Sequence, residues 1–283
     1  MIGPDDARRV LVVVAHPDDE TFGTGSLLLH LADHGVTTGV CCASRGEAGD
    51  VRGGVTVPAG GVGALREAEL RCAATLLGVA WVLLLDLVDS GMTGAAPPDS
   101  ITGTPMHEVT RRVSDAVARF LPDLIVTLDG SDGHRDHVRM RDAAVSAGCE
   151  HAIPVWLHCL PRDLMQRWAQ SLAGHDPDSP YLALGELGTP DEKVTTRIDT
   201  GEFYDRRWEA IALHRSQVSP YEALPEDLKR AFLTTERLRP APLPADPDST
   251  RHQHNRHTCY WDYLTCQWSC AHERNSADPQ VAR

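Results

Sequence analysis

A polar cluster follows the first apolar run of the chain, and its residue types are those of a metal site or an acid–base site. Residues 12–25 read VVVAHPDDETFGTG, so one imidazole and three carboxyls come directly after a run of apolar side chains. Ionisable side chains are rarely buried without a partner. The cluster therefore forms a metal site, an acid–base site or a solvated turn.

A second cluster of the same chemistry follows a later apolar run, residues 123–128. Two histidines and a carboxylate with an open coordination position are the ligands of a catalytic zinc, which lowers the pKa of bound water to about 7. A neighbouring carboxylate that does not bind the metal can accept the proton. Helix capping explains one aspartate of such a cluster but not its histidines. The second cluster consists of Asp129, Asp132, His134, Asp136 and His137.

The elements that must position these clusters alternate along the first half of the chain. Strands alternating with helices predict βαβ units, a mainly parallel sheet and a Rossmann-like, doubly wound α/β fold. In such a sheet the ligand crevice lies at the carboxyl ends of the strands, usually between the first and the fourth. We therefore expect the two clusters to meet there. The predicted strands are residues 9–15, 36–44, 80–87, 123–128 and 154–160, and helices are predicted at 24–35, 64–79, 106–120 and within 129–148.

The regular alternation weakens after residue 160. We predict a Rossmann-like catalytic core over residues 1–160 and a C-terminal α+β extension over 161–283, which completes the substrate pocket without being an independent domain. The extension contains helical patterns at 161–172 and 202–217, antiparallel edge strands at 180–187 and 193–200, and a proline-rich loop or linker at 239–249.

The end of the chain, residues 251–272, is rich in histidine and cysteine. A second metal site is one interpretation, and a closing strand or helix beside an exposed histidine-rich loop is the other. Zinc modules normally carry a CxxC pair, and the absence of one here favours the second interpretation.

Composition and charge restrict the classes of function. The 283 residues are 42% hydrophobic and carry a formal net charge of −13, without clustered lysine or arginine, so neither nucleic acid nor a membrane is an expected partner. We expect a cytoplasmic protein and leave a homo-oligomer open. Dinucleotide binding is also disfavoured, because the third glycine position after the first strand is Leu28 and the loop is acidic.

Several motifs occur in the order seen in one enzyme family. The segments AHPDDE, REAELRCAATLLGV, GHRDH and ALHRSQ, which lie within residues 8–220, resemble the PIG-L/LmbE family of zinc-dependent de-N-acetylases. The family includes the phosphatidylinositol-GlcNAc deacetylase and the mycothiol deacetylase. The resemblance implies a Rossmann-like hydrolase that removes the N-acetyl group from an N-acetylated amino sugar or its glycoside.

The resemblance also implies a role for each matching residue. Spacing alone leaves open whether His134 or His137 binds the metal. Iron or cobalt can replace zinc in the same set of ligands. In the family pattern the zinc ligands correspond to His16, Asp19 and His137, and the general base corresponds to Asp18. The group that polarises the carbonyl or protonates the amine corresponds to His134. The residue that orients an imidazole corresponds to Asp136.

Three further residues match family positions that contact substrate, namely Glu47, Arg66 and Asp89. A helix-surface ion pair for Arg66 and a turn for Asp89 are the simpler alternatives. The chain departs from mycothiol-type members at Asp132, where they carry a tyrosine. An ionised carboxylate cannot donate a hydrogen bond to an oxyanion, so another donor must take that role.

Three functions are consistent with these residues. The first is the N-deacetylase just described. The second is an amidase of a larger thiol-sugar conjugate, or a tailoring deacetylase of a glycosylated metabolite, with the glycine-rich loops 45–63 and 89–105 forming a wide mouth. The third is a binding module without turnover, which has no use for a free carboxylate such as Asp18 beside the metal ligands.

Overall fold

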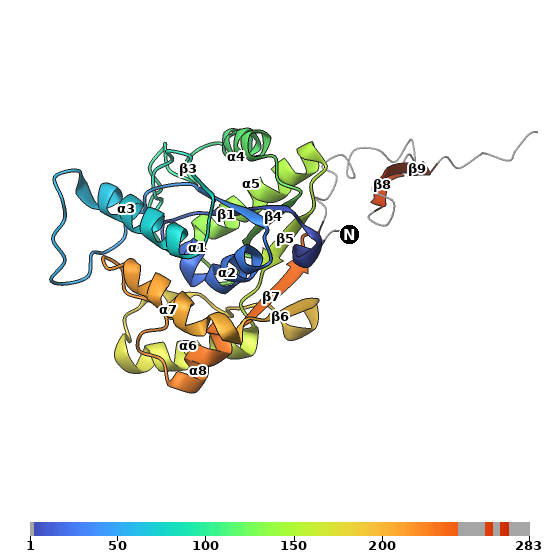
Figure 1. Cartoon of the computed structure of the whole chain (residues 1–283). Helices are drawn as coiled ribbons and strands as arrows, with labels where there is room; N and C mark the ends of the chain where they lie inside the picture. The colour runs from blue at the N-terminus through green and yellow to red at the C-terminus, as the bar shows by residue number, and fades with distance from the viewer. Residues whose placement is uncertain (1–2, 243–257, 263–266, 272–283) are drawn as a thin grey trace, which may run out of the picture. The chain divides into compact units, whose positions relative to one another are not determined.

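A seven-stranded sheet forms the centre of residues 3–242 in the computed structural model, which describes residues 3–242, 258–262 and 267–271 (Figure 1). The strands are β1 (Arg9–Val14), β2 (Thr37–Cys42), β3 (Trp81–Leu84), β4 (Leu124–Leu128), β5 (Val155–His158), β6 (Thr196–Asp199) and β7 (Thr235–Pro240). Their order across the sheet is β3-β2-β1-β4-β5-β7-β6. The first five are parallel, and β7 and β6 are antiparallel additions. The predicted doubly wound α/β fold is confirmed.

Helices cover both faces of this sheet. They are α1 (Asp19–Phe22), α2 (Gly25–Asp33), α3 (Gly61–Leu76), α4 (Met106–Phe120), α5 (Arg135–His151), α6 (Arg162–His175), α7 (Tyr204–Leu213) and α8 (Glu226–Leu233). Figure 1 shows α4 and α5 on one face, and α2 and α7 on the other. Alternate residues of β1 enter different cores: Val12 packs with α2, α3 and α7, whereas Val13 packs with α4 and α5. Burial on both faces explains why β1 is apolar from Val10 to Val14.

The winding of the sheet reverses between β1 and β4, which are neighbours as predicted. Val10 of β1 lies opposite Leu124 of β4, and both strands end at the same edge. The loop after β1 and the loop after β4 therefore emerge side by side. These are the two loops that carry the acidic and histidine clusters.

Residues 161–242 differ in part from the prediction. The expected strand at 193–200 is present as β6, but the expected strand at 180–187 is wrong, because Pro180–Ala183 form a 3₁₀-helix. Proline at the first position fixes a φ angle that suits a helical turn. The proline-rich stretch was expected to be a loop from residue 239, yet β7 extends to Pro240 and pairs with both β5 and β6. The alternation of buried Glu236 and Leu238 with half-buried neighbours marks this strand.

A buried ionic cluster joins these later elements to the core. Nη1 of Arg207 in α7 lies 3.0 Å from Oε1 of Glu236 in β7, and Oε2 of the same carboxylate lies 2.8 Å from Nε2 of His158 in β5. Arg207 also donates to the carbonyl oxygens of Phe22 and Gly23 directly after the first polar cluster. The cluster fixes α7 and β7 against the segment that carries the candidate site.

The last described residues form a separate two-stranded antiparallel sheet, β8 (Thr258–Asp262) with β9 (Gln267–Ala271). The sequence predicted a strand or a helix here, and the described residues form strands. The four tail histidines, His252, His254, His257 and His272, lie outside the described residues, and so does the second metal site that was one interpretation of this segment. Within the described ranges, no helix is long and apolar enough to cross a membrane.

Candidate metal centre

The loop after β1 places an aspartate at the first turn of α1. Oδ2 of Asp19 accepts the backbone N–H groups of Ala15 and His16 at 3.2 and 2.8 Å. These donors hold the carboxylate in one orientation and leave Oδ1 facing the interior of the site. The carboxylate is buried, and the positive charge of neighbouring imidazoles keeps the pKa of Asp19 well below its usual range despite burial.

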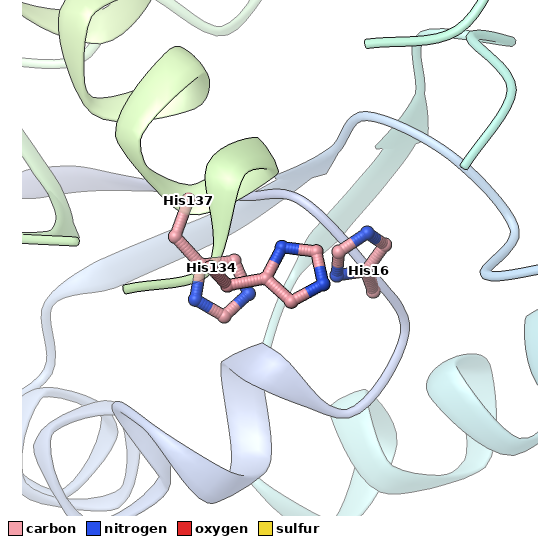
Figure 2. Close-up of side chains that lie close together, drawn as sticks. All are labelled: His16, His134 and His137. Atoms are coloured by element: carbon pink, nitrogen blue, oxygen red, sulfur yellow. The ribbon is translucent and has the colours of Figure 1, made fainter. Parts of the chain in front are cut away.

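The second cluster lies at the start of α5, where His134 is the N-cap and His137 stands in the first turn. Figure 2 shows the rings of His134 and His137 beside that of His16, which comes from the loop after β1. The ring centroid of His16 lies 4.9 Å from that of His134 and 5.5 Å from that of His137. Residues separated by more than a hundred positions in sequence thus meet at the reversal of the sheet, as predicted.

His137 has one nitrogen occupied and one directed into the site. Its Nδ1 lies 2.5 Å from Oδ2 of Asp132, and its Nε2 lies 3.1 Å from Oδ1 of Asp19. This Nε2 is buried and makes no hydrogen bond of acceptable geometry within the described residues. Burial alone lowers a histidine pKa, but the charges of Asp132 and Asp19 outweigh it and raise the pKa of His137 to about 10 in the metal-free protein.

His16 is oriented by two carboxylates on the far side of its ring. Nε2 lies 3.1 Å from Oδ2 of Asp136 and 3.4 Å from Oδ1 of Asp89, and Nδ1 lies 3.6 Å from Oδ2 of Asp19. Asp136 is itself held by the backbone N–H of Ser90 at 3.0 Å. Burial opposes the charged ring, but these carboxylates raise the pKa of His16 well above its usual value.

These donors suit a divalent cation. Asp19 lies close to both His16 and His137, and each of the three is oriented by an outer partner: His16 by Asp136, His137 by Asp132, and Asp19 by backbone N–H groups. An orphaned buried Nε2 facing a carboxylate oxygen is the arrangement that a cation between them would satisfy. Ligand atoms also lie within 4.8 Å of one another in the sets His16, His134, His137 and His16, Asp89, Asp136. The residues present therefore fit a metal ion.

His134 differs from His137 in the partner of its Nδ1 atom and in the charge of its ring. Its Nδ1 accepts the backbone N–H of Asp136 at 3.2 Å. Burial and the two neighbouring imidazoles lower the pKa of His134 to about 4, so the ring is neutral at pH 7. A neutral imidazole has one N–H, which must then be at Nε2. His134 therefore presents a hydrogen-bond donor to the site, whereas Nε2 of His137 would present a lone pair only after the ring loses the proton that Asp132 and Asp19 hold on it in the metal-free protein.

Asp18 has an unusual backbone conformation, with φ of 118°. Such a conformation costs a non-glycine residue about 1–3 kcal/mol and persists only when surrounding contacts enforce it. Here Oε2 of Glu20 accepts the backbone N–H of Asp18 at 2.9 Å, and Nη2 of Arg66 contacts the Pro17 carbonyl at 2.7 Å and Oδ2 of Asp18 at 2.9 Å. Burial raises the pKa of the Asp18 carboxyl to about 6, although Arg66 opposes the shift.

The predicted substrate residues occupy different positions. Asp89 is buried, lines the cavity and contacts His16. Arg66 also lines the cavity, but its donors are directed to Asp18, Pro17 and the carbonyl of Gly46. A Cβ atom on Gly46, where φ is 66°, would lie 2.4 Å from Arg66 Cζ. Glu47 is exposed and contacts the backbone N–H of Asp89 at 3.4 Å rather than the cavity.

The site opens into a cavity of about 840 Å³. One part is lined by the residues described above, including His16, Asp19 and His137. The other part is lined mainly by apolar side chains from residues 158–232. Drug-sized ligands fill pockets of about 300–1,000 Å³, so the cavity accepts more than a single small group.

Sequence reasoning assigned no role to three residues that support the site. Asp132 was recognised as a member of the second cluster and as a departure from a tyrosine, without a role of its own, yet it holds Nδ1 of His137. Glu20 carries the last carboxyl of HPDDE, and its Oε1 lies 2.8 Å from Nε2 of His214. The segment ALHRSQ contains His214, so the motif itself was the available signal. What it could not indicate was which carboxylate the imidazole would meet.

Comparison with known proteins agrees with this geometry. A deacetylase from Saccharopolyspora erythraea, 1D-myo-inositol 2-acetamido-2-deoxy-alpha-D-glucopyranoside deacetylase 1, is 32% identical over 74% of this chain and 78% of its own. The corresponding deacetylase of Geodermatophilus obscurus is 29% identical over 82% of this chain and 92% of its own. The solved structure of N,N'-diacetylchitobiose deacetylase from Pyrococcus horikoshii shares the fold, with a TM-score of 0.55, 21% identity, and coverage of 84% of this chain and 85% of that one.

Part of the sequence also matches a known protein family. Residues 11–148 match PIG-L, GlcNAc-PI de-N-acetylase. This region spans β1 to α5, and so it includes both polar clusters and the reversal of the sheet between them. Taken together with the identity to the Saccharopolyspora relative over most of both chains, the match shows that this chain belongs to the PIG-L family.

Proposed function

We propose that this protein is a metal-dependent hydrolase that removes the N-acetyl group from an N-acetylated amino sugar or its glycoside. The observation that carries the proposal is the opposite orientation of two neighbouring imidazoles. His137 directs its Nε2 toward Asp19, where it would bind a metal ion after losing its proton, while His134 directs an N–H into the same cavity. A metal ligand and a hydrogen-bond donor beside one another are what hydrolysis of an amide requires. The deacetylase relatives support the same reaction.

The metal would be held by His16, Asp19 and His137. Nitrogen and carboxylate ligands suit zinc, and iron or cobalt can occupy the same set. Such an ion supplies a Lewis acid and lowers the pKa of a water molecule bound to it. The outer partners Asp136 and Asp132 fix the ring orientation of the two histidines.

The free carboxylate of Asp18 acts as the general base. Arg66 and Glu20 hold it beside the ligands without making it one of them. It accepts a proton from the attacking water while the water oxygen bonds to the acyl carbon. Nε2–H of His134 donates to the carbonyl oxygen as negative charge develops there. The C–N bond then breaks, the amine receives the proton, and acetate and the free amino sugar leave.

The residues around the site refine the substrate assignment. Asp89 accepts hydrogen bonds and lines the cavity, so we assign it to a sugar hydroxyl. Arg66 is assigned to positioning Asp18, because its donors are already directed there. Asp132 is bound to His137 and cannot replace the tyrosine of mycothiol-type members as an oxyanion donor. His134 is therefore the donor.

A larger conjugate of an amino sugar is the second candidate substrate, and the size of the cavity favours it. The contribution of residues 161–283 to the substrate pocket, the cytoplasmic location and a homo-oligomeric state stay predictions of the sequence.

The deciding experiment measures metal content of the purified protein together with amine release from a panel of N-acetylglucosaminides. We expect about one equivalent of metal per chain, with amine release that disappears after chelation and returns with added zinc. Amine release that is insensitive to chelation would contradict a metal-dependent reaction. Metal binding without amine release from any panel member would reject the small N-acetylated sugar as the substrate.

A further inference from the structure

The cavity continues beyond the metal centre into an apolar chamber. We define this chamber by Leu128, Leu160, Met165, Trp168, Leu172 and Tyr221, which line the same cavity as His16 and His137. An acetyl group ends in one methyl, which the immediate surroundings of the metal ligands can cover. The chamber is therefore more space than the proposed reaction needs.

The polar atoms of the six residues that define the chamber are already paired within the protein. The indole N–H of Trp168 donates to the Pro220 carbonyl at 2.9 Å, and the hydroxyl of Tyr221 donates to the Phe22 carbonyl at 2.6 Å. Nε2 of His158, at the edge of the chamber, lies 2.8 Å from Glu236. Their ring faces and the neighbouring aliphatic side chains remain to contact a ligand. Such a wall stabilises an apolar group and offers a sugar few hydrogen bonds.

The chamber lies on the opposite side of the metal centre from the polar substrate residues. The order β3-β2-β1-β4-β5 places the segments after β3 and β2 on one side of β1, and the segment after β5 on the other. Asp89 follows β3, whereas Leu160 follows β5 and Met165 belongs to α6. His16 and His137, which follow β1 and β4, lie between them. An amide held at the metal centre therefore has one substituent directed to the polar side and the other to the chamber.

We propose that the chamber binds the acyl part of the substrate amide, and that the preferred substrate is an amino sugar with an apolar N-acyl group larger than acetyl. This inference rests on the proposed function. Water adds its oxygen to the acyl carbon, the C–N bond breaks, and the amine takes the proton. The products are the amino sugar and a medium-chain or aromatic carboxylate. A sugar with its hydroxyls toward Asp89 directs its nitrogen to the metal and its acyl group to the chamber.

The opening of the chamber is consistent with an apolar guest. Val218 lines the cavity and is 67% exposed. Beside it, Arg52 from the glycine-rich loop pairs with Glu222, with Nη1 lying 3.0 Å from Oε2. The charged side chains at the rim thus neutralise each other and leave the apolar residue facing the opening.

The test compares two series of substrates on the unaltered enzyme. In the first, glucosamine carries acetyl, butanoyl, hexanoyl, octanoyl or benzoyl on nitrogen. In the second, N-acetylglucosamine carries methyl, hexyl or phenyl as the aglycone. We expect kcat/KM for amine release to rise about fourfold with each methylene of the acyl series, mainly through KM, and to stay flat in the aglycone series. The benzoyl compound distinguishes an aromatic acyl group from an alkyl one.

A rise in the aglycone series with a flat or falling acyl series would overturn the proposal. Calorimetric binding of N-octanoylglucosamine and N-acetylglucosamine separates this failure from failure of the proposed function. Tighter binding of the octanoyl compound without turnover supports the chamber and rejects the hydrolytic reaction. Equal binding of the two compounds rejects the chamber.

A pair of variants on one helix locates the effect. Leu172 lines the chamber, whereas Gln170 is exposed and outside it. Leu172→Glu places a charge in the chamber, and we expect the ratio of octanoyl to acetyl kcat/KM to fall at least about tenfold. Gln170→Glu adds the same charge to α6, and we expect this ratio to stay unchanged. An equal fall in both variants would contradict the assignment.

Discussion

At the scale of single residues, side chains of the same type have different roles in the site because their atoms contact different partners. His134 and His137 are three positions apart on one helix, but one accepts a backbone N–H at Nδ1 and the other contacts a carboxylate there. Asp18 and Asp19 are adjacent, but one contacts Arg66 and the other accepts backbone N–H groups. Neighbouring contacts therefore assign different chemistry to identical side chains.

The histidine pair provides a direct test of ligand assignment. We expect His137→Ala to lose the metal and His134→Ala to retain it. Nδ1 of the neutral His134 accepts a backbone N–H and leaves the proton on Nε2, whereas Nε2 of His137 faces Asp19 and has no hydrogen-bond partner among the described residues. Both variants should lose most of the activity. Metal content after gel filtration measures the difference. Loss of metal in His134→Ala with retention in His137→Ala would reverse the assignment.

The aspartate pair tests the general base in the same way. Asp18→Asn keeps the size of the side chain but cannot accept a proton, so kcat should fall about 100- to 10,000-fold. Metal content should remain at the wild-type level, because Asp18 is not among the proposed ligands. Asp19→Asn is the matched control and should weaken metal binding. A fully active Asp18→Asn enzyme would exclude Asp18 as the base.

At the scale of elements, strands and helices far from the site determine whether its loops are held in place. Arg207 of α7 reaches Glu236 of β7 and the carbonyls that follow α1, and both side chains are buried. Buried charges are costly unless every partner is present. Helix α7 and strand β7 are thus connected to the segment HPDDE by buried ionic contacts, and the loss of any one partner would leave a buried charge unpaired.

Removal of one charge from this cluster should destabilise the protein strongly. Glu236→Gln leaves Arg207 buried without its counter-ion, and we expect the free energy of unfolding to fall by about 3 kcal/mol or more. Urea denaturation followed by circular dichroism measures the change. Asp115→Asn breaks the exposed pair with Arg111 and should leave the transition nearly unchanged. Similar effects of both variants would show that burial of the Glu236 cluster has no special importance.

At the scale of the whole molecule, stability depends on carboxylates that are ionised in the interior. Burial raises the pKa of Glu236, but the charges of Arg207 and His158 outweigh it and hold this pKa below the usual 4.5. A carboxyl with a lowered folded-state pKa stabilises the protein above its unfolded pKa, and this contribution is lost as the pH falls through the folded pKa.

We therefore expect the free energy of unfolding to decrease as the pH falls below about 4.5. The slope should be smaller in Glu236→Gln, because that variant has one fewer carboxyl to protonate. Urea denaturation at a series of pH values, on metal-free protein, measures both slopes. Identical slopes in the two proteins would show that Glu236 does not contribute to acid unfolding.

Much of the fold could be predicted because its signals are local. Apolar runs of strand length alternated with helical patterns and placed β1 to β5, and β6 was predicted as an edge strand, so six of the seven strands in residues 3–242 were predicted. The errors fall after residue 160, where Pro180 begins a 3₁₀-helix and β7 forms only by pairing with both β5 and β6. Antiparallel additions at a sheet edge depend on partners far away in the chain, which local patterns do not contain.

The sequence by itself determined the type of chemistry, because it contains two clusters of acidic residues and histidines, each directly after a predicted strand. The ends of these two strands meet where the winding of the sheet reverses. Tertiary structure decided how that chemistry is divided. Asp132 was expected only to replace a tyrosine of mycothiol-type members and to leave the oxyanion to another donor, and contact with Nδ1 of His137 makes it a supporting residue. Arg66 was expected to meet substrate, and its donors instead reach Asp18 and Pro17. Residue type is fixed by the sequence, but the proton on an imidazole and the partner of a guanidinium depend on which atoms the fold places within hydrogen-bonding distance.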